Sequence, residues 1–353
     1  MRWSRLVTMV DAHAEGEIGR VVTGGLPEIS GRTPAEKLRH LNEVDDSLRR
    51  FLVFEPRGSA QMSTNILVPK TMPEADAAYM IVQADKVHAM SGSNSMCLAT
   101  VLLETGMVPM REPETVVRIE TPAGLVKATA RCRDGKCERV TIDMTPAFVE
   151  ELDRVVEVPG LGAIKVDIAY GGCFYALVDG RQLGLEIVPA NARKLVDVGM
   201  RVQQVLNRSA PVVHPEIPEI RGISYTMLTG WNAEGEPTGA TILPPGRVDR
   251  SPCGTGNAAR MAVRLARGEV RPGAKVRARS IIGGVFDVEL VGEASVAGRQ
   301  AALTRVSGRA WLYGMHQIAY DPSDPFPKGF LLTDTWGEAL DLLTTTPSDG
   351  GRS

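Results

Sequence analysis

Two short segments of the chain share one pattern, and this repetition limits the possible folds more than any other feature. Ser91 and Cys253 each precede small residues, which are followed by an apolar run typical of a helix. The runs end at Gly106 and Gly268, so each glycine lies 15 residues after its Ser or Cys. We therefore expect a duplicated unit of strand, loop and helix, with one copy in each half of the chain.

The start of each predicted helix is suited to binding an anion. The first backbone N–H groups of a helix have no partner within it, and the helix dipole adds a partial positive charge. Two such helix ends facing each other can hold one carboxylate, with Ser91 and Cys253 flanking the adjacent carbon. We therefore predict that Ser91 and Cys253 are the catalytic pair.

The length and charge of the chain favour a two-lobed protein with a small ligand. A chain of 353 residues exceeds the usual length of one compact domain. Its 40 Lys and Arg nearly balance its 42 Asp and Glu, which argues against a nucleic-acid partner. No stretch approaches the roughly 20 apolar residues of a membrane span, and Asp11 interrupts any signal-peptide core. We therefore predict a cytoplasmic protein with no membrane partner.

The cysteines indicate reduced thiols. There are five of them, an odd number at scattered spacing, with no CxxC motif and no paired Cys and His ligands. The glycines that follow Cys253 lack the GxGxxG and Gly-Lys-Ser/Thr patterns of nucleotide-binding loops. We therefore predict no metal and no cofactor.

Short β-branched segments between Gly and Pro residues predict a protein rich in strands. Residues 115–120, 140–143 and 164–168 alternate as half-buried strands do. The glycine-bearing segment 133–136 predicts a hairpin turn between residues 128–132 and 137–141. The pattern therefore predicts mostly β lobes, each with a central helix.

Outside the duplicated unit, the sequence predicts surface helices over residues 34–50, 191–207 and 335–343. Thr33 precedes Pro34, which suits an N-cap followed by proline in the first turn. The proline-rich residues 209–220 predict a loop, and the small, polar residues 345–353 predict a frayed tail.

The two residues of the predicted catalytic pair, Ser91 and Cys253, differ in their ability to act as a base. A thiol at a helix N-terminus has its thiolate stabilised, so we expect the pKa of Cys253 to fall towards neutrality. A hydroxyl is a poor base without help, so Ser91 is expected to donate or relay a proton, or simply to cap its helix. Asp249, just before the second unit, can pair with a cationic amine on the ligand.

Several motifs together resemble the proline racemase family over nearly the whole chain. The most specific lies at residues 249–256, Asp-Arg-Ser-Pro-Cys-Gly-Thr-Gly. The others are Asp11-Ala12-His13-Ala14-Glu15-Gly16-Glu17, Glu55-Pro56-Arg57-Gly58, Met90-Ser91-Gly92, Tyr170-Gly171-Gly172, Gly308-Arg309-Ala310-Trp311 and Asp324-Pro325-Phe326. The family is cofactor-independent and includes hydroxyproline 2-epimerases and trans-3-hydroxy-L-proline dehydratases.

The resemblance implies an α+β fold of two pseudo-symmetric lobes of the diaminopimelate-epimerase type, each a curled sheet around a central helix. We place the N-terminal lobe at residues 1–175, completed by part of the C-terminal segment, and the C-terminal lobe at 176–320. Residues 321–353 form the C-terminal segment and tail. The resemblance also implies a substrate carboxylate on the backbone N–H groups of Gly92, Ser93, Gly254 and Thr255. It places the substrate ring nitrogen on Asp249.

The departures from the family pattern decide the expected reaction. Racemases and epimerases of the family place a Cys on each face of Cα, whereas here Ser91 replaces the first, and Ser93 replaces the usual His. Ser at the first position resembles the dehydratase branch, although that branch often carries Thr where this chain has Cys253. We expect mainly dehydration of trans-3-hydroxy-L-proline to Δ1-pyrroline-2-carboxylate, with 2-epimerisation of 3-hydroxyproline as a side activity.

Several alternatives stay open at this stage. The chain could be a 4-hydroxyproline 2-epimerase, converting trans-4-hydroxy-L-proline to cis-4-hydroxy-D-proline, or a proline racemase. More distant alternatives are a non-catalytic amino-acid-binding protein and a thiol-dependent hydrolase with Cys253 as nucleophile. The expected partner is a small imino acid, and a homodimer is possible.

Overall fold

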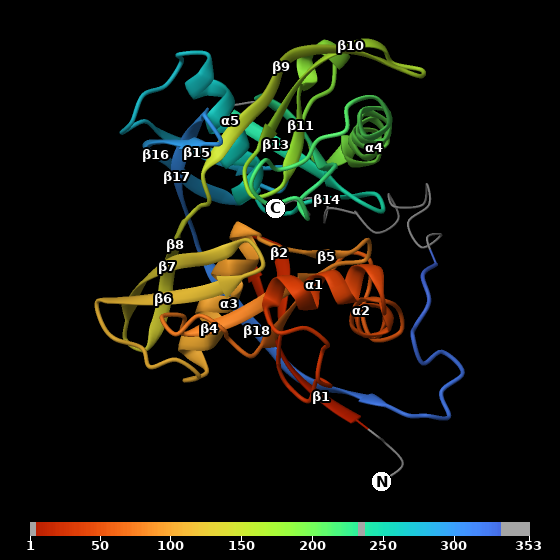
Figure 1. Cartoon of the computed structure of the whole chain (residues 1–353), viewed down its shortest axis with the longest axis vertical. Coiled ribbons are helices and arrows are strands. Elements are labelled where there is room, and N and C mark those ends of the chain that lie inside the picture. The colour runs from red at the N-terminus through yellow and green to blue at the C-terminus, as the bar shows by residue number, and fades with distance from the viewer. Residues whose placement is uncertain (1–4, 232–236, 333–353) are drawn as a thin grey trace, which may run out of the picture.

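The computed structural model describes residues 5–231 and 237–332, which form two lobes stacked along the long axis of the molecule (Figure 1). Within these residues, 18 strands join into one continuous sheet that curls through both lobes. The chain passes between the lobes twice, from β8 to β9 and from β17 to β18 (Figure 1).

The first lobe is a curled sheet around the helix α3 (Gly92–Glu104), which contacts strands from both ends of the chain. Helices α1 (Pro34–Glu43) and α2 (Ser47–Val53) lie on its outer side. Its strands are β1 (Arg5–Ala14), β2 (Glu17–Gly24), β3 (Ser63–Val68), β4 (Ala77–Val82), β5 (Val87–His88), β6 (Glu114–Thr121), β7 (Gly124–Arg133), β8 (Lys136–Asp143) and the returning β18 (Ala310–Tyr320).

The second lobe is a closed ring of paired strands around the helix α5 (Gly254–Ala266). Helix α4 (Ala192–Ser209) packs outside the ring. The strands of this lobe are β9 (Ala147–Val158), β10 (Gly162–Tyr170), β11 (Phe174–Asp179), β12 (Ile223–Trp231), β13 (Pro237–Leu243), β14 (Arg247–Val248), β15 (Lys275–Ser280), β16 (Val285–Val296) and β17 (Arg299–Gly308).

The two lobes repeat one topology, which confirms the predicted duplication. The parallel pairs β2–β3 and β4–β6 correspond to β11–β12 and β13–β15. The short strands β5 and β14 lead into the central helices α3 and α5, and Gly106 and Gly268 follow those helices with φ of +74° and +70°. Glycine suits these left-handed C-terminal positions because it has no Cβ.

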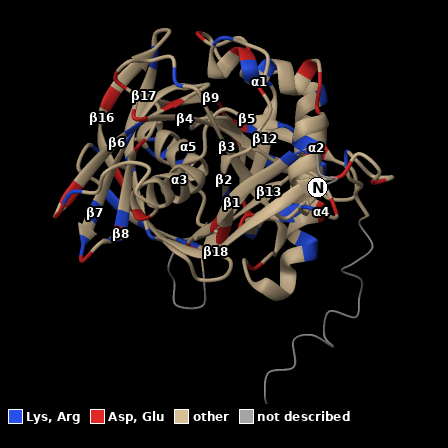
Figure 2. Cartoon of the chain, turned by 90° about the horizontal axis from the view of Figure 1, so that it is seen from below, with Lys and Arg blue, Asp and Glu red and all other residues tan. Residues whose placement is uncertain are grey.

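The central helices are buried because they are apolar or small on nearly every side. In α3, every residue from Gly92 to Leu103 is buried, and the helix packs in the core cluster of the first lobe. A helix without a polar face must be enclosed by other elements. Figure 2 shows α3 and α5 inside the strands, with the charged residues gathered on the outer elements.

The contacts between elements suggest lobe boundaries that differ from those drawn from the sequence. Strands β9 and β10, assigned above to the N-terminal lobe, pack against α5, and β18 pairs with β1 along its length. We therefore propose that residues 5–143 and 310–320 form one lobe and that residues 147–231 and 237–308 form the other.

The predicted helix over residues 34–50 is wrong in one respect, because it is broken into α1 and α2. The break follows from Asp45, whose side chain accepts a hydrogen bond from the backbone N–H of Ser47 at 2.9 Å. Such local bonds compete with helix continuation. Thr33 caps α1 as predicted, α4 occupies the second predicted helix, and residues 210–220 form a loop. The predictions for residues 335–343 and 345–353 lie outside the described residues.

Candidate active site

The N-termini of α3 and α5 meet at the boundary between the lobes. Gly92 and Gly254, the first residues of the two helices, are so close that a Cβ added to Gly254 would lie 3.1 Å from Gly92 Cα. Only glycines allow the helix ends to approach in this way. The unpaired N–H groups of both first turns therefore border one space, as the sequence predicted.

Ser91 is the N-cap of α3. Its Oγ accepts hydrogen bonds from the side-chain Nδ2 of Asn94 at 2.9 Å and from the backbone N–H of Asn94 at 3.4 Å. The Oγ of Ser93 lies 3.3 Å away. Two N–H donors and a helix end all favour negative charge on the Ser91 oxygen.

Cys253 is the N-cap of α5, and its Sγ accepts a hydrogen bond from the backbone N–H of Gly256 at 3.3 Å. The hydroxyl of Tyr175 lies 3.3 Å from the same sulfur and 2.7 Å from Thr255 Oγ1. Cys253 adopts a φ of +68°, in the left-handed region that non-glycine residues rarely occupy. Backbone strain of this kind is often found at functional sites.

The expectation that the pKa of Cys253 falls towards neutrality is wrong for the ligand-free protein. Burial, followed by the negative charge of Asp249, raises the pKa of this thiol to about 11. The hydrogen bond from Gly256 acts in the opposite direction but is outweighed. The sequence argument counted the helix end and missed the cost of desolvation.

Alkylation of the ligand-free protein tests this pKa. Because a thiol reacts as its thiolate, we expect the iodoacetamide reaction at Cys253 to accelerate about tenfold per pH unit from pH 7 to 10. Peptide mass spectrometry would separate modification of Cys253 from that of the other thiols. A rate that levels off near pH 8 would instead support the lower pKa that the sequence suggested.

Asp249 lies at the end of β14 and is buried. One carboxylate oxygen accepts the backbone N–H of Ser251 at 2.8 Å. Burial and the nearby Glu17 raise the pKa of Asp249, and Arg247 partly offsets them. A buried carboxylate of this kind is suited to receive a cation that enters the site.

These side chains surround a small cavity of about 20 Å³ between the lobes. That is room for little more than one water molecule, so a ligand the size of proline enters only if the lobes separate or side chains move. The lining residues are Glu17, Gln83, His88, Met90, Ser91, Ser93, Asn94, Tyr175, Tyr225, Thr241, Leu243, Asp249, Cys253, Gly254 and Thr255.

Six of the seven predicted site residues line this cavity, and the seventh, Gly92, contacts Gly254. Their roles remain predictions. Two residues of the other family motifs lie elsewhere: His13 stacks on Trp311, and Arg57 pairs with Asp324. Neither His13 nor Arg57 lines the cavity.

The site residues predicted from the sequence do not include the polar wall formed by Gln83, His88 and Tyr225. The Tyr225 hydroxyl lies 3.3 Å from Gln83 Oε1 and 3.0 Å from His88 Nδ1, and Asp85 contacts the same imidazole. Tyr225 sits on β12 and Gln83 follows β4, so only the packing of the two lobes brings them together. No local motif in the sequence marks them.

A larger groove of about 590 Å³ lies outside the cavity, between the α1–α2 region and residues 217–224. His88 and Met90 line both the groove and the cavity. Among residues 5–231 and 237–332, no cluster of three or more His, Cys, Asp or Glu side chains is arranged to hold a metal ion. Within the same ranges, no helix has the length and hydrophobicity needed to span a membrane.

Comparison with known proteins places this geometry in context. The sequence profile of the family described as "Proline racemase" matches residues 9–331. The "4-hydroxyproline 2-epimerase 1" of Rhizobium rhizogenes is 53% identical over 339 residues, which cover 96% of this chain and 98% of that protein. The "4-hydroxyproline 2-epimerase" of Agrobacterium fabrum has the same identity and coverage.

A solved structure is similar over nearly its whole length. A hydroxyproline epimerase from Agrobacterium vitis, crystallised with trans-4-hydroxy-L-proline, superposes with a TM-score of 0.92 at 52% sequence identity. The match covers 97% of this chain and 100% of that chain. This similarity confirms the predicted α+β fold of two lobes.

Proposed function

Because the chain belongs to the proline racemase family, we propose that it is a 2-epimerase that converts trans-4-hydroxy-L-proline to cis-4-hydroxy-D-proline. The observation that carries the proposal is the pair of facing helix ends, with Ser91 and Cys253 as their N-caps at one cavity. The names of the similar proteins support 4-hydroxyproline as the substrate.

Epimerisation corrects the main prediction from the sequence. That prediction, dehydration of trans-3-hydroxy-L-proline, rested on Ser91 in the first position. The comparisons support its stated alternative instead, since the similar proteins are named as epimerases of hydroxyproline. A Ser and Cys pair suffices for epimerisation if each group can exchange a proton with one face of Cα.

The substrate carboxylate would bind to the free N–H groups at the start of α3 and α5. As the α-proton leaves, negative charge moves from Cα onto the carboxylate oxygens. Preorganised N–H donors stabilise this charge without having to reorient during the reaction. The same donors hold Cα between the Ser91 oxygen and the Cys253 sulfur, as in-line proton transfer requires.

The substrate ammonium would bind to Asp249 and thereby help to activate the thiol. In the ligand-free protein, the charge of Asp249 is one cause of the raised pKa of Cys253. A cation on Asp249 cancels that repulsion, so substrate binding lowers the pKa of Cys253 and favours its thiolate. Cys253 then removes the α-proton of one epimer or, as the thiol, donates a proton to the carbanion of the other.

Ser91 would carry out the proton transfer on the opposite face. Asn94 donates two hydrogen bonds to its oxygen, which reduces the cost of transient negative charge there. The Ser93 hydroxyl, 3.3 Å away, can pass the proton onward. The Cα–H bond that breaks on one face is replaced by one on the other, so only the configuration changes.

The decisive experiment is incubation of the protein with trans-4-hydroxy-L-proline and, separately, trans-3-hydroxy-L-proline in D2O, followed by proton NMR. We expect cis-4-hydroxy-D-proline with deuterium at Cα from the first compound. A pyrroline carboxylate from the second compound, without epimerisation of the first, would favour the dehydratase. No exchange in either would favour a binding protein.

Tyr225→Phe tests how the ring hydroxyl is recognised. The cavity combines the polar wall of Gln83, His88 and Tyr225 with the apolar Met90 and Leu243. Loss of one hydroxyl that pairs with the substrate should lower kcat/KM for trans-4-hydroxy-L-proline about tenfold relative to L-proline.

The control for Tyr225→Phe is Tyr170→Phe, at a buried tyrosine that does not line the cavity. Steady-state kinetics on both substrates give the comparison. Equal losses for hydroxyproline and proline would assign Tyr225 a role in packing rather than in recognition.

A further inference from the structure

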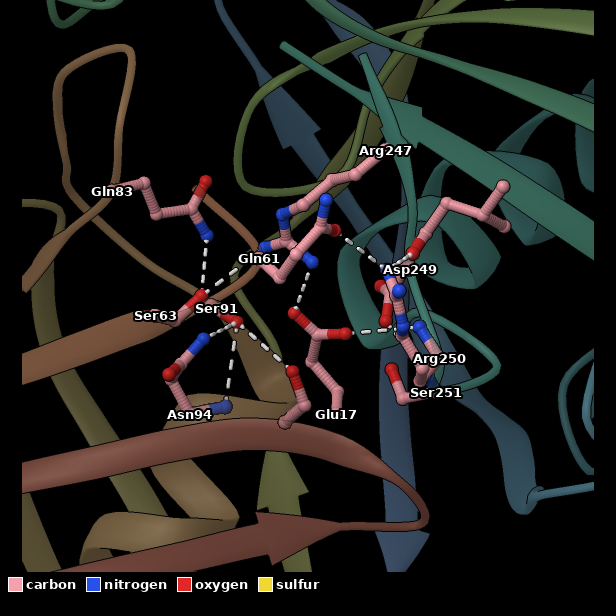
Figure 3. A network of polar contacts seen from close by, with 12 residues as sticks. Glu17, Gln61, Ser63, Gln83, Ser91, Asn94, Arg247, Asp249, Arg250 and Ser251 are labelled. Atoms are coloured by element: carbon pink, nitrogen blue, oxygen red, sulfur yellow. Dashed lines mark hydrogen bonds and ion pairs between the residues drawn. The ribbon is translucent and has the colours of Figure 1, made fainter. Parts of the chain in front are cut away.

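A buried ion pair crosses between the two lobes beside the candidate active site. Arg247 Nη1, on β14, lies 2.6 Å from Glu17 Oε1, at the start of β2. The side chains are only 2% and 4% exposed. Figure 3 shows Glu17 between the Arg247 side chain and the Arg250 backbone. Removing two charges from water is costly, so the pair needs an explanation beyond stability.

The contacts of Glu17 tie the segment that carries Asp249 to the other lobe. Its second oxygen accepts the backbone N–H of Arg250 at 2.9 Å. Arg250 Nη1 donates to Gln61 Oε1 at 3.2 Å, which adds another link across the lobes. Asp249 is therefore flanked on both sides by residues that Glu17 holds.

The charges around Asp249 form a simple set. Glu17 approaches Asp249 from β2, and Arg247 and Arg250 lie close to Asp249 in the chain. The Cys253 thiol faces Asp249 from the N-terminus of α5. The Arg250 guanidinium turns away to Gln61 and the Val248 carbonyl. The charge of Arg247 offsets that of Glu17 only in part, because Glu17 has the larger effect on the pKa of Asp249.

We propose that Glu17 and Arg247 are positioning residues, which hold Asp249 in place and set its charge as the acceptor for the ammonium group of the ligand. The inference rests on the proposed function for the nature of that ligand. Burial and Glu17 raise the pKa of Asp249, whereas Arg247 lowers it. Removal of Arg247 should therefore raise the pKa of Asp249 further, and removal of the Glu17 charge should lower it.

The test is the titration of Asp249 in the ligand-free protein. Carbon NMR of protein labelled at the aspartate carboxyl carbon monitors this titration. The Asp249 resonance is assigned by its absence in Asp249→Asn. In Arg247→Met, we expect the midpoint to rise by about one pH unit or more. In Glu17→Gln it should fall, since the negative charge is lost while the amide oxygen can still accept a hydrogen bond from one of the two donors, Arg247 and Arg250. This variant decides the question if Arg247→Met does not fold.

Ligand binding gives a second readout. The binding of trans-4-hydroxy-L-proline is measured by calorimetry in a Cys253→Ala background, which prevents turnover. There, Arg247→Met should lower the affinity about tenfold at pH 7, and the affinity should recover by pH 9. Arg247→Lys should restore most of the affinity at pH 7. Pyrrole-2-carboxylate, which has no ammonium charge, should lose little affinity at pH 7.

The matched control is Arg20→Met, which breaks another buried ion pair, with Asp11 at 2.8 Å, away from the cavity. It should leave the Asp249 titration unchanged. An unmoved Asp249 midpoint in both Arg247→Met and Glu17→Gln would overturn the inference. The inference would also be overturned if Arg247→Met lowered the affinities for trans-4-hydroxy-L-proline and pyrrole-2-carboxylate equally at both pH 7 and pH 9. Failure of the parent Cys253→Ala protein to bind hydroxyproline would count against the proposed function, while the titration still decides this inference.

Discussion

Replacing Cys253 with Ala is expected to lower kcat for hydroxyproline epimerisation about 1,000-fold, the range over which positioned acid–base groups act. The thiol is one of two groups placed to move a proton at Cα, and none of the other described thiols lines the cavity. Proton NMR in D2O measures both the loss of turnover and the loss of deuterium uptake at Cα.

The variant should still fold and bind. Ala can adopt the same backbone as Cys at the N-cap, and the helix ends and Asp249 that hold the ligand remain. Calorimetric binding of pyrrole-2-carboxylate should therefore change little. Cys132→Ala, at a buried thiol of β7, is the control and should keep nearly full activity. If Cys253→Ala exchanged the α-proton at the wild-type rate, the assigned role of Cys253 would be wrong.

The sequence predicted the duplicated unit well because its signals are local. The small residues after Ser91 and Cys253 and the glycines at 106 and 268 fix where α3 and α5 begin and end. Local signals also explain the error over residues 34–50. A single side-chain bond from Asp45 broke a helix whose apolar pattern continues through the break.

The residues that sequence reasoning missed depend on contacts between distant segments. Glu17 lies in one of the family motifs, but its partner Arg247 is 230 positions away, so nothing local shows that the two residues form a pair. The predicted direction of the pKa shift of Cys253 was wrong for a related reason. The helix end can be read from the sequence, but burial and the approach of Asp249 are properties of the assembled lobes.

Asp249→Asn is expected to lower kcat/KM about 100-fold to 1,000-fold, since it leaves the ligand ammonium without its charged partner in a buried site. Most of the loss should appear in KM. The protein should fold, because Glu17 and Arg247 remain paired and the Asn oxygen can still accept the backbone N–H of Ser251. Steady-state kinetics and a thermal melt measure these effects.

In the same variant we expect the reactivity of the Cys253 thiol to rise while turnover falls. This difference separates an electrostatic effect from structural damage. Asp249 is the nearby charge that raises the pKa of Cys253, so its neutralisation should lower that pKa. Alkylation of Cys253 at pH 8 should therefore be faster in Asp249→Asn than in the wild type, although turnover is nearly lost. Slower or unchanged alkylation, together with normal folding, would show that Asp249 does not act on the thiol as the geometry implies.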